Sequence, residues 1–94
     1  MSPRATTSSL HFDEDDNLLC VLRGLKRVAL VSPRNAEALQ PAPVGNHCEA
    51  SVWSGGGDGV LVVDVREGDV LAIPRGHWHS VRSDAGTIAV NFWA

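Results

Sequence analysis

Residues 68–79 read GDVLAIPRGHWH, and this stretch gives the clearest indication of the fold class. It holds a short apolar run, Val70–Ile73, which follows the turn residues Glu67-Gly68-Asp69 and ends at Pro74 and Gly76. Four apolar residues between such residues are typical of a β-strand, because proline and glycine interrupt regular structure on both sides. A second extended segment, Trp78–Arg82, follows at once, so the stretch predicts two short strands joined by a tight turn.

Short apolar runs separated by turn residues continue on both sides of this stretch. Further strands are expected at Leu18–Arg23, Lys26–Val31, Val60–Val65 and Thr87–Trp93. The first two flank Gly24 and are expected to form a hairpin. Several short strands with turns between them predict an all-β sandwich or barrel.

The middle of the chain departs from this pattern. Ser32-Pro33 resembles a helix N-cap followed by proline at the first helical position, which predicts one short helix over Pro33–Leu39. Residues 41–58 contain two prolines and four glycines and are expected to form a loop. The length of 94 residues suits a single domain covering 1–94.

Composition narrows the functional classes. Apolar residues make up 44% of the chain, as in globular proteins, and the formal charge of −3 gives no basic footprint for nucleic acid. No apolar run is long enough to span a bilayer, and residues 1–10 lack the apolar core of a signal peptide. The chain is therefore expected inside the cell, in the cytoplasm or nucleus, with its oligomeric state left open.

The two cysteines lie in unlike surroundings. Cys20 falls inside an apolar run and is expected to be a buried, structural thiol, whereas Cys48 falls in the polar loop. A disulfide between them is possible but disfavoured, because a reducing compartment is expected.

Two histidines and an aspartate form the strongest candidate site. His11 and Asp13 are two residues apart, so on a strand both side chains point to one face. His79 lies on a distant strand, and two histidines with one carboxylate would bind a divalent metal and leave positions open, as in non-haem Fe(II) oxygenases. A surface hydrogen bond between His11 and Asp13 is the alternative if the pair stands alone.

Lys26 is the candidate anion-binding residue. On a strand it shares a face with Val28 and Leu30, which are expected to point inward, while Arg27 points the other way. An inward lysine is costly unless an anion pairs with it. The alternative is a lysine at the strand end whose ammonium reaches solvent.

Spacing and local sequence carry a resemblance to a known family. The pattern Gly68-(five residues)-Pro74-x-Gly76-x-x-His79 fits the second cupin motif, and His11-x-Asp13 with Asn17 and Gly24 fits the spacing of the first. Residues 11–28, 68–79 and 89–93 resemble the metal-binding and closing segments of Jumonji C hydroxylases. Similar proteins include asparaginyl hydroxylases of the factor-inhibiting-HIF type and tRNA wybutosine hydroxylases. The resemblance covers about residues 8–40 and 60–93 and implies a truncated double-stranded β-helix, the cupin or jelly-roll type of barrel.

The resemblance also implies roles for individual residues. His11, Asp13 and His79 would ligate Fe(II), and Lys26 would pair with the distal carboxylate of the co-substrate 2-oxoglutarate. Three further residues would line the co-substrate pocket: Asn17, Asn91 and Ser8. The implied activity is that of a dioxygenase that uses dioxygen to hydroxylate or demethylate a protein or tRNA. A small metal-binding cupin module without redox turnover is the alternative.

Other residues have less specific interpretations. His77 is read as a pocket wall or a surface histidine, and His47 as a solvated loop residue. The three tryptophans are expected to pack in the core or at its rim: Trp53, Trp78 and Trp93. Only ten residues precede His11, so N-terminal barrel elements of the family are expected to be absent. A fragment, a minimal active barrel and a metal-binding remnant all remain open.

Overall fold

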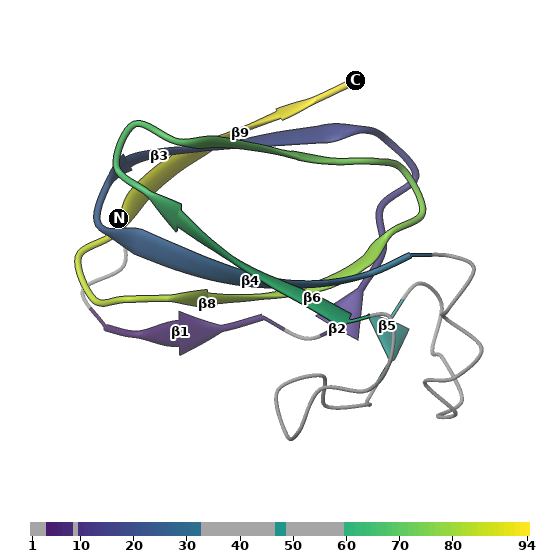
Figure 1. The fold of residues 1–94 in the computed structure, drawn as a ribbon, viewed down its shortest axis with the longest axis horizontal. Coiled ribbons are helices and arrows are strands. Elements are labelled where there is room, and N and C mark those ends of the chain that lie inside the picture. The colour runs from purple at the N-terminus through teal and green to yellow at the C-terminus, as the bar shows by residue number, and fades with distance from the viewer. Residues whose placement is uncertain (1–3, 9, 33–46, 49–59) are drawn as a thin grey trace.

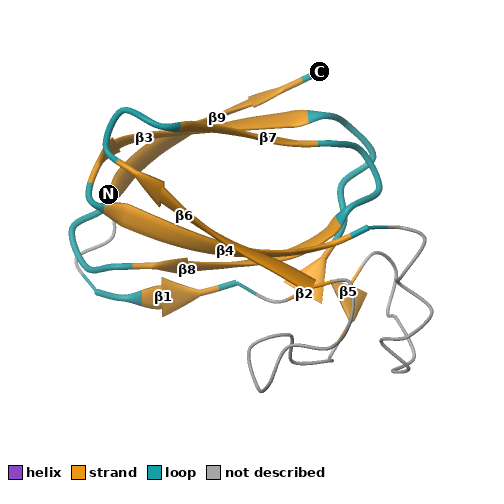
Figure 2. Ribbon diagram, in the orientation of Figure 1, coloured by secondary structure: helices purple, strands orange, loops and turns teal. Residues whose placement is uncertain are grey.

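The computed structural model describes residues 4–8, 10–32, 47–48 and 60–94, and these residues form strands and connecting loops with no helix among them (Figures 1 and 2). The expected all-β class is therefore confirmed. The strands are β1 (Thr6–Thr7), β2 (Leu10–His11), β3 (Asn17–Arg23), β4 (Leu25–Val31), β5 (His47–Cys48), β6 (Val60–Arg66), β7 (Val70–Ile73), β8 (Trp78–Ser83) and β9 (Ile88–Trp93).

The strands form two antiparallel sheets that face one another. The larger sheet has the order β5-β2-β8-β4-β6, with β1 also paired to β8, and the smaller sheet has the order β7-β3-β9. Figure 1 shows them as two layers, with β3 and β9 in one and β4, β6, β8 and β1 in the other. This arrangement is that of a cupin or jelly-roll fold, as the sequence led us to expect.

Connected strands change sheet instead of forming hairpins. β3 pairs with β7 and β9, whereas β4 pairs with β6 and β8, so the hairpin expected around Gly24 is wrong. Gly24 makes the crossing possible because its φ is +92° and a β-carbon there would lie 2.6 Å from Thr87 Oγ1. The single linking residue turns the chain into the opposite layer, where β4 buries its apolar side chains.

The main core lies between the two sheets. Its buried members come from both layers: Leu19, Val21, Val28, Val65 and Ile73. In β3 the burial alternates, with Asn17, Leu19 and Val21 pointing inward and Leu18 and Leu22 exposed. This period of two is the pattern of a strand with one buried face.

Two expectations fall largely outside the described residues. The helix expected over 33–39 lies wholly outside them. The loop expected over 41–58 is wrong at His47–Cys48, whose backbone pairs with β2, and the remainder of that range lies outside the described residues. The single-domain assignment remains a prediction. Within the described parts of the chain, no helix could span a membrane.

Candidate metal centre

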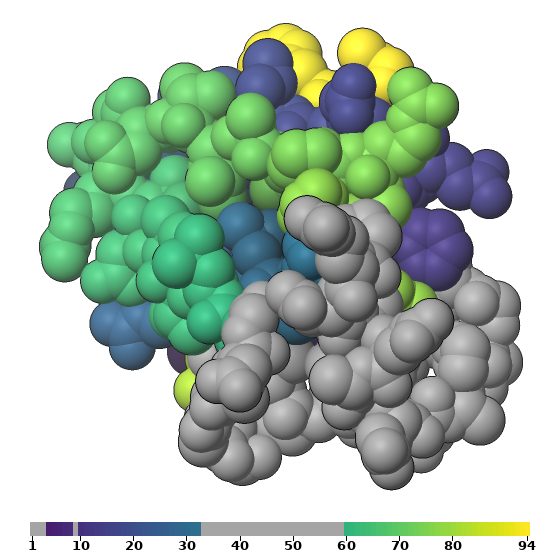
Figure 3. All heavy atoms as spheres, turned by 45° about the vertical axis from the view of Figure 1, so that its right-hand side comes forward, coloured from purple at the N-terminus to yellow at the C-terminus, as the bar shows by residue number. Residues whose placement is uncertain are grey.

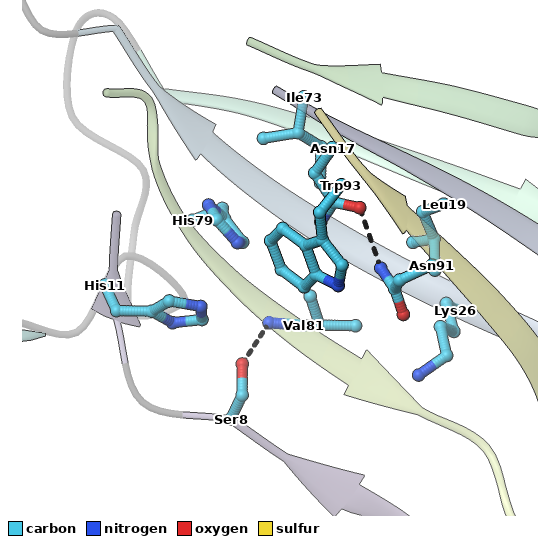
Figure 4. A pocket seen from close by; sticks show the side chains of 10 residues that line it. All are labelled: Ser8, His11, Asn17, Leu19, Lys26, Ile73, His79, Val81, Asn91 and Trp93. Carbon is cyan, nitrogen blue, oxygen red and sulfur yellow. Dashed lines mark hydrogen bonds between the residues drawn. The ribbon is translucent and has the colours of Figure 1, made fainter. Parts of the chain in front are cut away.

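Strand pairing brings the two histidines together. β2 and β8 are antiparallel neighbours, and His11 lies directly opposite His79 in their register. Their ring centroids are 4.3 Å apart, at an interplanar angle of 55°. Residues 68 positions apart in sequence therefore present their imidazoles to the same point, at one end of the pocket in Figure 4.

Asp13 reaches the same point from a loop and not from a strand. The argument from strand parity was wrong on this detail, because β2 ends at His11. The loop is instead fixed to the turn before β8, where Gly76 N–H donates to Asp13 O at 3.0 Å. Arg75 N–H donates to Asp16 Oδ1 at 2.8 Å and adds a second link. The carboxylate thus sits on a segment tied to the strand that carries His79.

The three side chains are arranged as ligands. One ligand atom from each of His11, Asp13 and His79 lies within 4.8 Å of the other two. The Oδ2 atom of Asp13 is 3.3 Å from His79 Nε2 and 3.9 Å from His11 Nε2. Two ligands bound at about 2.0–2.2 Å on adjacent positions of one ion are roughly 3 Å apart. These spacings therefore suit one divalent cation with only small movements.

Hydrogen bonding does not account for this cluster. His79 Nδ1 lies 2.9 Å from the carbonyl oxygen of His77, and because a carbonyl only accepts, Nδ1 carries the proton. In the neutral ring Nε2 then carries a lone pair and no proton, and it faces Asp13 Oδ2. That carboxylate oxygen is buried with no hydrogen-bond partner. The 3.9 Å separation from His11 is too long for the surface hydrogen bond considered as the alternative. Two acceptors that face each other fit a bound cation.

Burial favours the form of His79 that binds metal. Desolvation lowers the pKa of His79, and the neighbouring His11 lowers it further, although the bond to the His77 carbonyl and the Asp13 carboxylate act in the opposite direction. A neutral imidazole whose other nitrogen donates to a backbone carbonyl is the usual state of a metal-ligating histidine.

A pocket of about 230 Å³ opens beside this cluster. This volume lies below the usual 300–1,000 Å³ of pockets for drug-sized ligands, so a small molecule fits it. Figure 4 shows that its walls come from both sheets. The lining residues are Ser8, His11, Asn17, Leu19, Lys26, Ile73, His79, Val81, Asn91 and Trp93.

Lys26 points into this pocket, as its strand parity predicted. Its Nζ donates to Ser83 Oγ at 2.9 Å, and desolvation lowers its pKa. Among the described residues, no carboxylate forms an ion pair with Lys26. A half-buried ammonium with only a hydroxyl partner is able to take up an anion.

The other three expected pocket residues also lie at its wall. Asn91 Nδ2 donates to Asn17 Oδ1 at 3.0 Å, which fixes two amides on neighbouring strands of the smaller sheet. Ser8 is anchored to β8, since its Oγ accepts from Val81 N–H at 2.9 Å. The structure thus brings together all four expected co-substrate residues, and which ligand they bind remains a prediction.

Sequence reasoning missed two pocket features. Packing in the core or at its rim is the role expected for Trp93, yet its indole lies in the pocket between His79 and Lys26 (Figure 4), and the residue is 54% exposed. Ser83, which accepts the Lys26 hydrogen bond, was not named. Its parity with His79 on one strand was the available signal.

Other expectations are resolved less specifically. His77 acts through its carbonyl oxygen, and its own Nδ1 is buried without a hydrogen-bond partner. Trp78 packs against the small core cluster and meets Phe12 edge-on, with ring centroids 5.0 Å apart. Cys20 is an unpaired thiol, but it is only partly buried, on the outer side of β3, so its expected full burial is wrong. Trp53 and the side chains of His47 and Cys48 lie outside the described residues.

Comparison with known proteins agrees with this geometry. The family model of the cupin-like domain matches residues 1–55 and 57–93. Among curated proteins, the chain is 35% identical to "Lysine-specific demethylase JMJ31" of Arabidopsis thaliana, over 99% of this chain and 20% of that protein.

Two further relatives give the same picture. "Jumonji C domain-containing protein 5" of Drosophila melanogaster is 32% identical, over 99% of this chain and 26% of that protein. "Lysine-specific demethylase 8" of Danio rerio is 33% identical, over 97% of this chain and 25% of that protein. The chain thus spans about a fifth to a quarter of the length of these relatives. It belongs to the Jumonji C and cupin-like family.

Proposed function

We propose that the chain is an Fe(II)- and 2-oxoglutarate-dependent dioxygenase that hydroxylates or demethylates a macromolecule. The observation that carries this proposal is the meeting of His11, Asp13 and His79 at one end of a pocket whose other end holds Lys26. Lys26 is the only lysine in the chain, and the remaining cations are arginines. The chain thus combines a candidate facial ligand set with one matching cation.

The ligand set defines what the metal could do. Three protein ligands on one side leave the opposite coordination positions open to small molecules. Fe(II) with 2-oxoglutarate and dioxygen supplies the oxidation of a C–H bond, with succinate and carbon dioxide as co-products. In this proposal the three side chains hold the ion, and the bond from His79 to the His77 carbonyl keeps that imidazole in the binding tautomer.

The pocket would orient an elongated dianion. Lys26 is opposite Ser83 in the strand register, and Leu30 is opposite His79, so the cation and the ligand cluster lie at different heights along β8. His79 and Ser83 are four residues apart, or roughly 13 Å along an extended strand. 2-Oxoglutarate has a chelating keto acid at one end and a second carboxylate at the other. It is shorter than this backbone separation, and the side chains of His79 and Lys26, which both line the pocket, would span the remainder.

The substrate class follows from the relatives and is part of the proposal. Two of the three relatives described above are named lysine-specific demethylases. These names favour a protein substrate for this chain. The likeness to tRNA wybutosine hydroxylases keeps tRNA as the second possibility.

Succinate formation tests the proposal directly. The 94-residue chain would be incubated with Fe(II), ascorbate and 2-oxoglutarate, and succinate measured without a prime substrate. We expect slow turnover, because decarboxylation can proceed uncoupled from substrate oxidation, and no turnover in His79→Ala. Metal binding with no succinate in the parent protein would refute the dioxygenase and favour the metal-binding module.

A further inference from the structure

The outer face of the smaller sheet is apolar. In a sheet with one buried face the outward side chains are ordinarily polar. Here β3, β7 and β9 instead present an exposed apolar surface, with Leu18 44%, Leu22 57% and Phe92 57% exposed. We call this surface the outer face; its apolar members are Leu18, Cys20, Leu22, Val70, Ala72, Val90 and Phe92.

The size of the outer face fits a small protein interface. Three strands about 4.8 Å apart and about six residues long cover roughly 14 Å by 20 Å. Continuous apolar patches of roughly 300–600 Å² on soluble proteins often mark interaction sites. Figure 3 shows indigo atoms, from the part of the chain that includes β3, beside yellow atoms from the end of β9 at the top of the molecule. These two strands form one surface.

A groove and a protrusion lie at opposite ends of the outer face. The groove, of about 510 Å³, is lined by Leu18, Ala72 and Phe92 among others, at the end where β3 begins. The protrusion in this proposal is the side chain of Leu22, which is 57% exposed at the other end of the same strand. The register between β3 and β9 shifts between Val21 and Arg23, so Leu22 is the extra residue of a bulge.

Charges also differ between the two ends. Glu14, Asp15 and Asp16 are exposed just before β3, with the exposed Arg75 beside them, and we call this the acidic end. Arg23 is exposed where β3 finishes, and the exposed Glu67 and Asp69 lie beside that end. A surface that carries both a knob and its groove, and both signs of charge, is complementary to itself when two copies meet in antiparallel orientation.

We propose that the outer face binds a second copy of this chain, in a two-fold dimer whose axis crosses the strands near Cys20. That axis places Leu22 of each copy over the Leu18 end of the other, so each knob enters a groove. It also places each Arg23 at the acidic end of the other copy. The opposite choice, with strands parallel, would bring like charges together and leave both grooves empty.

The area of the outer face limits the expected affinity of the dimer. A standard interface buries about 800 Å² on each partner, and the outer face, at roughly 14 Å by 20 Å, is smaller than that. We therefore expect a dissociation constant in the micromolar range. The proposal does not depend on bound metal, so it stands or falls separately from the dioxygenase.

Sedimentation equilibrium of the 94-residue chain tests the interface. Leu22→Glu should raise the dimer dissociation constant by roughly 100-fold or more, because both copies place a carboxylate in an apolar groove. The matched control is Leu61→Glu on β6 of the larger sheet, at a leucine that is 60% exposed, and it should change the constant little. A parent chain that stays monomeric at high micromolar concentration would overturn the proposal. Equal effects of the two variants would overturn it as well.

Thiol cross-linking gives a second readout that does not rely on Leu22→Glu folding. In a Cys48→Ser background Cys20 is the only thiol of the chain. Because the proposed axis passes near Cys20, a short bifunctional maleimide should join two copies in good yield at concentrations where the dimer forms. A dimer that sediments as such but gives no cross-link through Cys20 would place the interface elsewhere and refute this geometry.

Discussion

The two sheets differ in which side chains they bury and which they expose. The larger sheet carries His11, His79 and Lys26 on its inner side, while ion pairs lie on its outer surface, with Arg27 Nε 2.7 Å from Asp64 Oδ1. At one end of the smaller sheet a polar side chain is buried and its apolar neighbour is exposed. Its inward Asn17 is 4% exposed, whereas the adjacent Leu18 is 44% exposed on the outside.

This reversal separates positions that serve the fold from positions that serve a site. A buried amide is costly unless it is bonded, and Asn17 is satisfied by Asn91 across the pocket wall. An exposed leucine gains nothing in an isolated sheet. Departures from the inside-outside rule therefore coincide with the pocket on one side of β3 and with the proposed dimer face on the other.

The largest expected difference between the sheets concerns metal. His79→Ala removes a ligand from the larger sheet and should abolish Mn(II) binding, followed by calorimetry with Mn(II) in place of iron. Asn91→Ala, from the pocket wall of the smaller sheet, should leave Mn(II) affinity nearly unchanged. Similar losses in the two variants would mean that the ligand set is not confined to the larger sheet and its attached loop.

Substitution of two adjacent leucines compares how much the inner and outer sides of β3 contribute to stability. Leu19 is 2% exposed in the core, so Leu19→Ala should lower the free energy of unfolding by about 2–5 kcal/mol. Leu18→Ala, on the outer face, should cost less than about 1 kcal/mol in dilute solution. Urea denaturation of both variants measures the difference, and an equal cost at the two positions would contradict the assignment of an outer face.

Substitution of two adjacent cations on β4 compares how the inner and outer sides of the larger sheet contribute to 2-oxoglutarate binding. Lys26→Ala should weaken 2-oxoglutarate binding by roughly 30-fold or more, because the distal carboxylate loses the one lysine or arginine among the described residues that line the pocket. Manganese affinity should persist in this variant. Arg27→Ala, which breaks the exposed pair with Asp64, should leave 2-oxoglutarate binding unchanged. Calorimetry on the Mn(II)-loaded proteins decides, and unchanged affinity in Lys26→Ala would remove Lys26 from the site.

The smallest expected effect is a pH dependence of stability. Burial lowers the pKa of Lys26 in the folded chain below 10.5, so between the folded and unfolded pKa values the unfolded chain binds more protons. Folding stability in the absence of ligand should therefore rise with pH across that window. Lys26→Met should lack this rise. The chain has one lysine and no tyrosine, which simplifies the comparison, and parallel pH profiles for the two proteins would contradict a desolvated Lys26.

The sequence predicted local structure and the clustering of His11, Asp13 and His79 better than it predicted strand partners. The strand over Val70–Ile73 has the expected bounds, and the spacing around His79 located the ligand cluster. The hairpin across Gly24 failed because sheet membership depends on strands that lie far away in the chain. Cys20 was expected to be buried because it lies in an apolar run, but such a run does not reveal which of its two faces is buried.

The alternation of connected strands between layers also determines when the chain can fold. β3 pairs only with β7 and β9 among the described strands, and both follow it by half the chain or more. On the ribosome, Leu18–Leu22 therefore emerges long before its partner strands are synthesised. Until then these residues cannot form their sheet. Such non-local pairing slows folding, because the chain must close long loops before any pairing compensates the lost entropy. Nascent chains that lack Ile88–Trp93 should remain open to proteases and chaperones, and protection should arise in one late step.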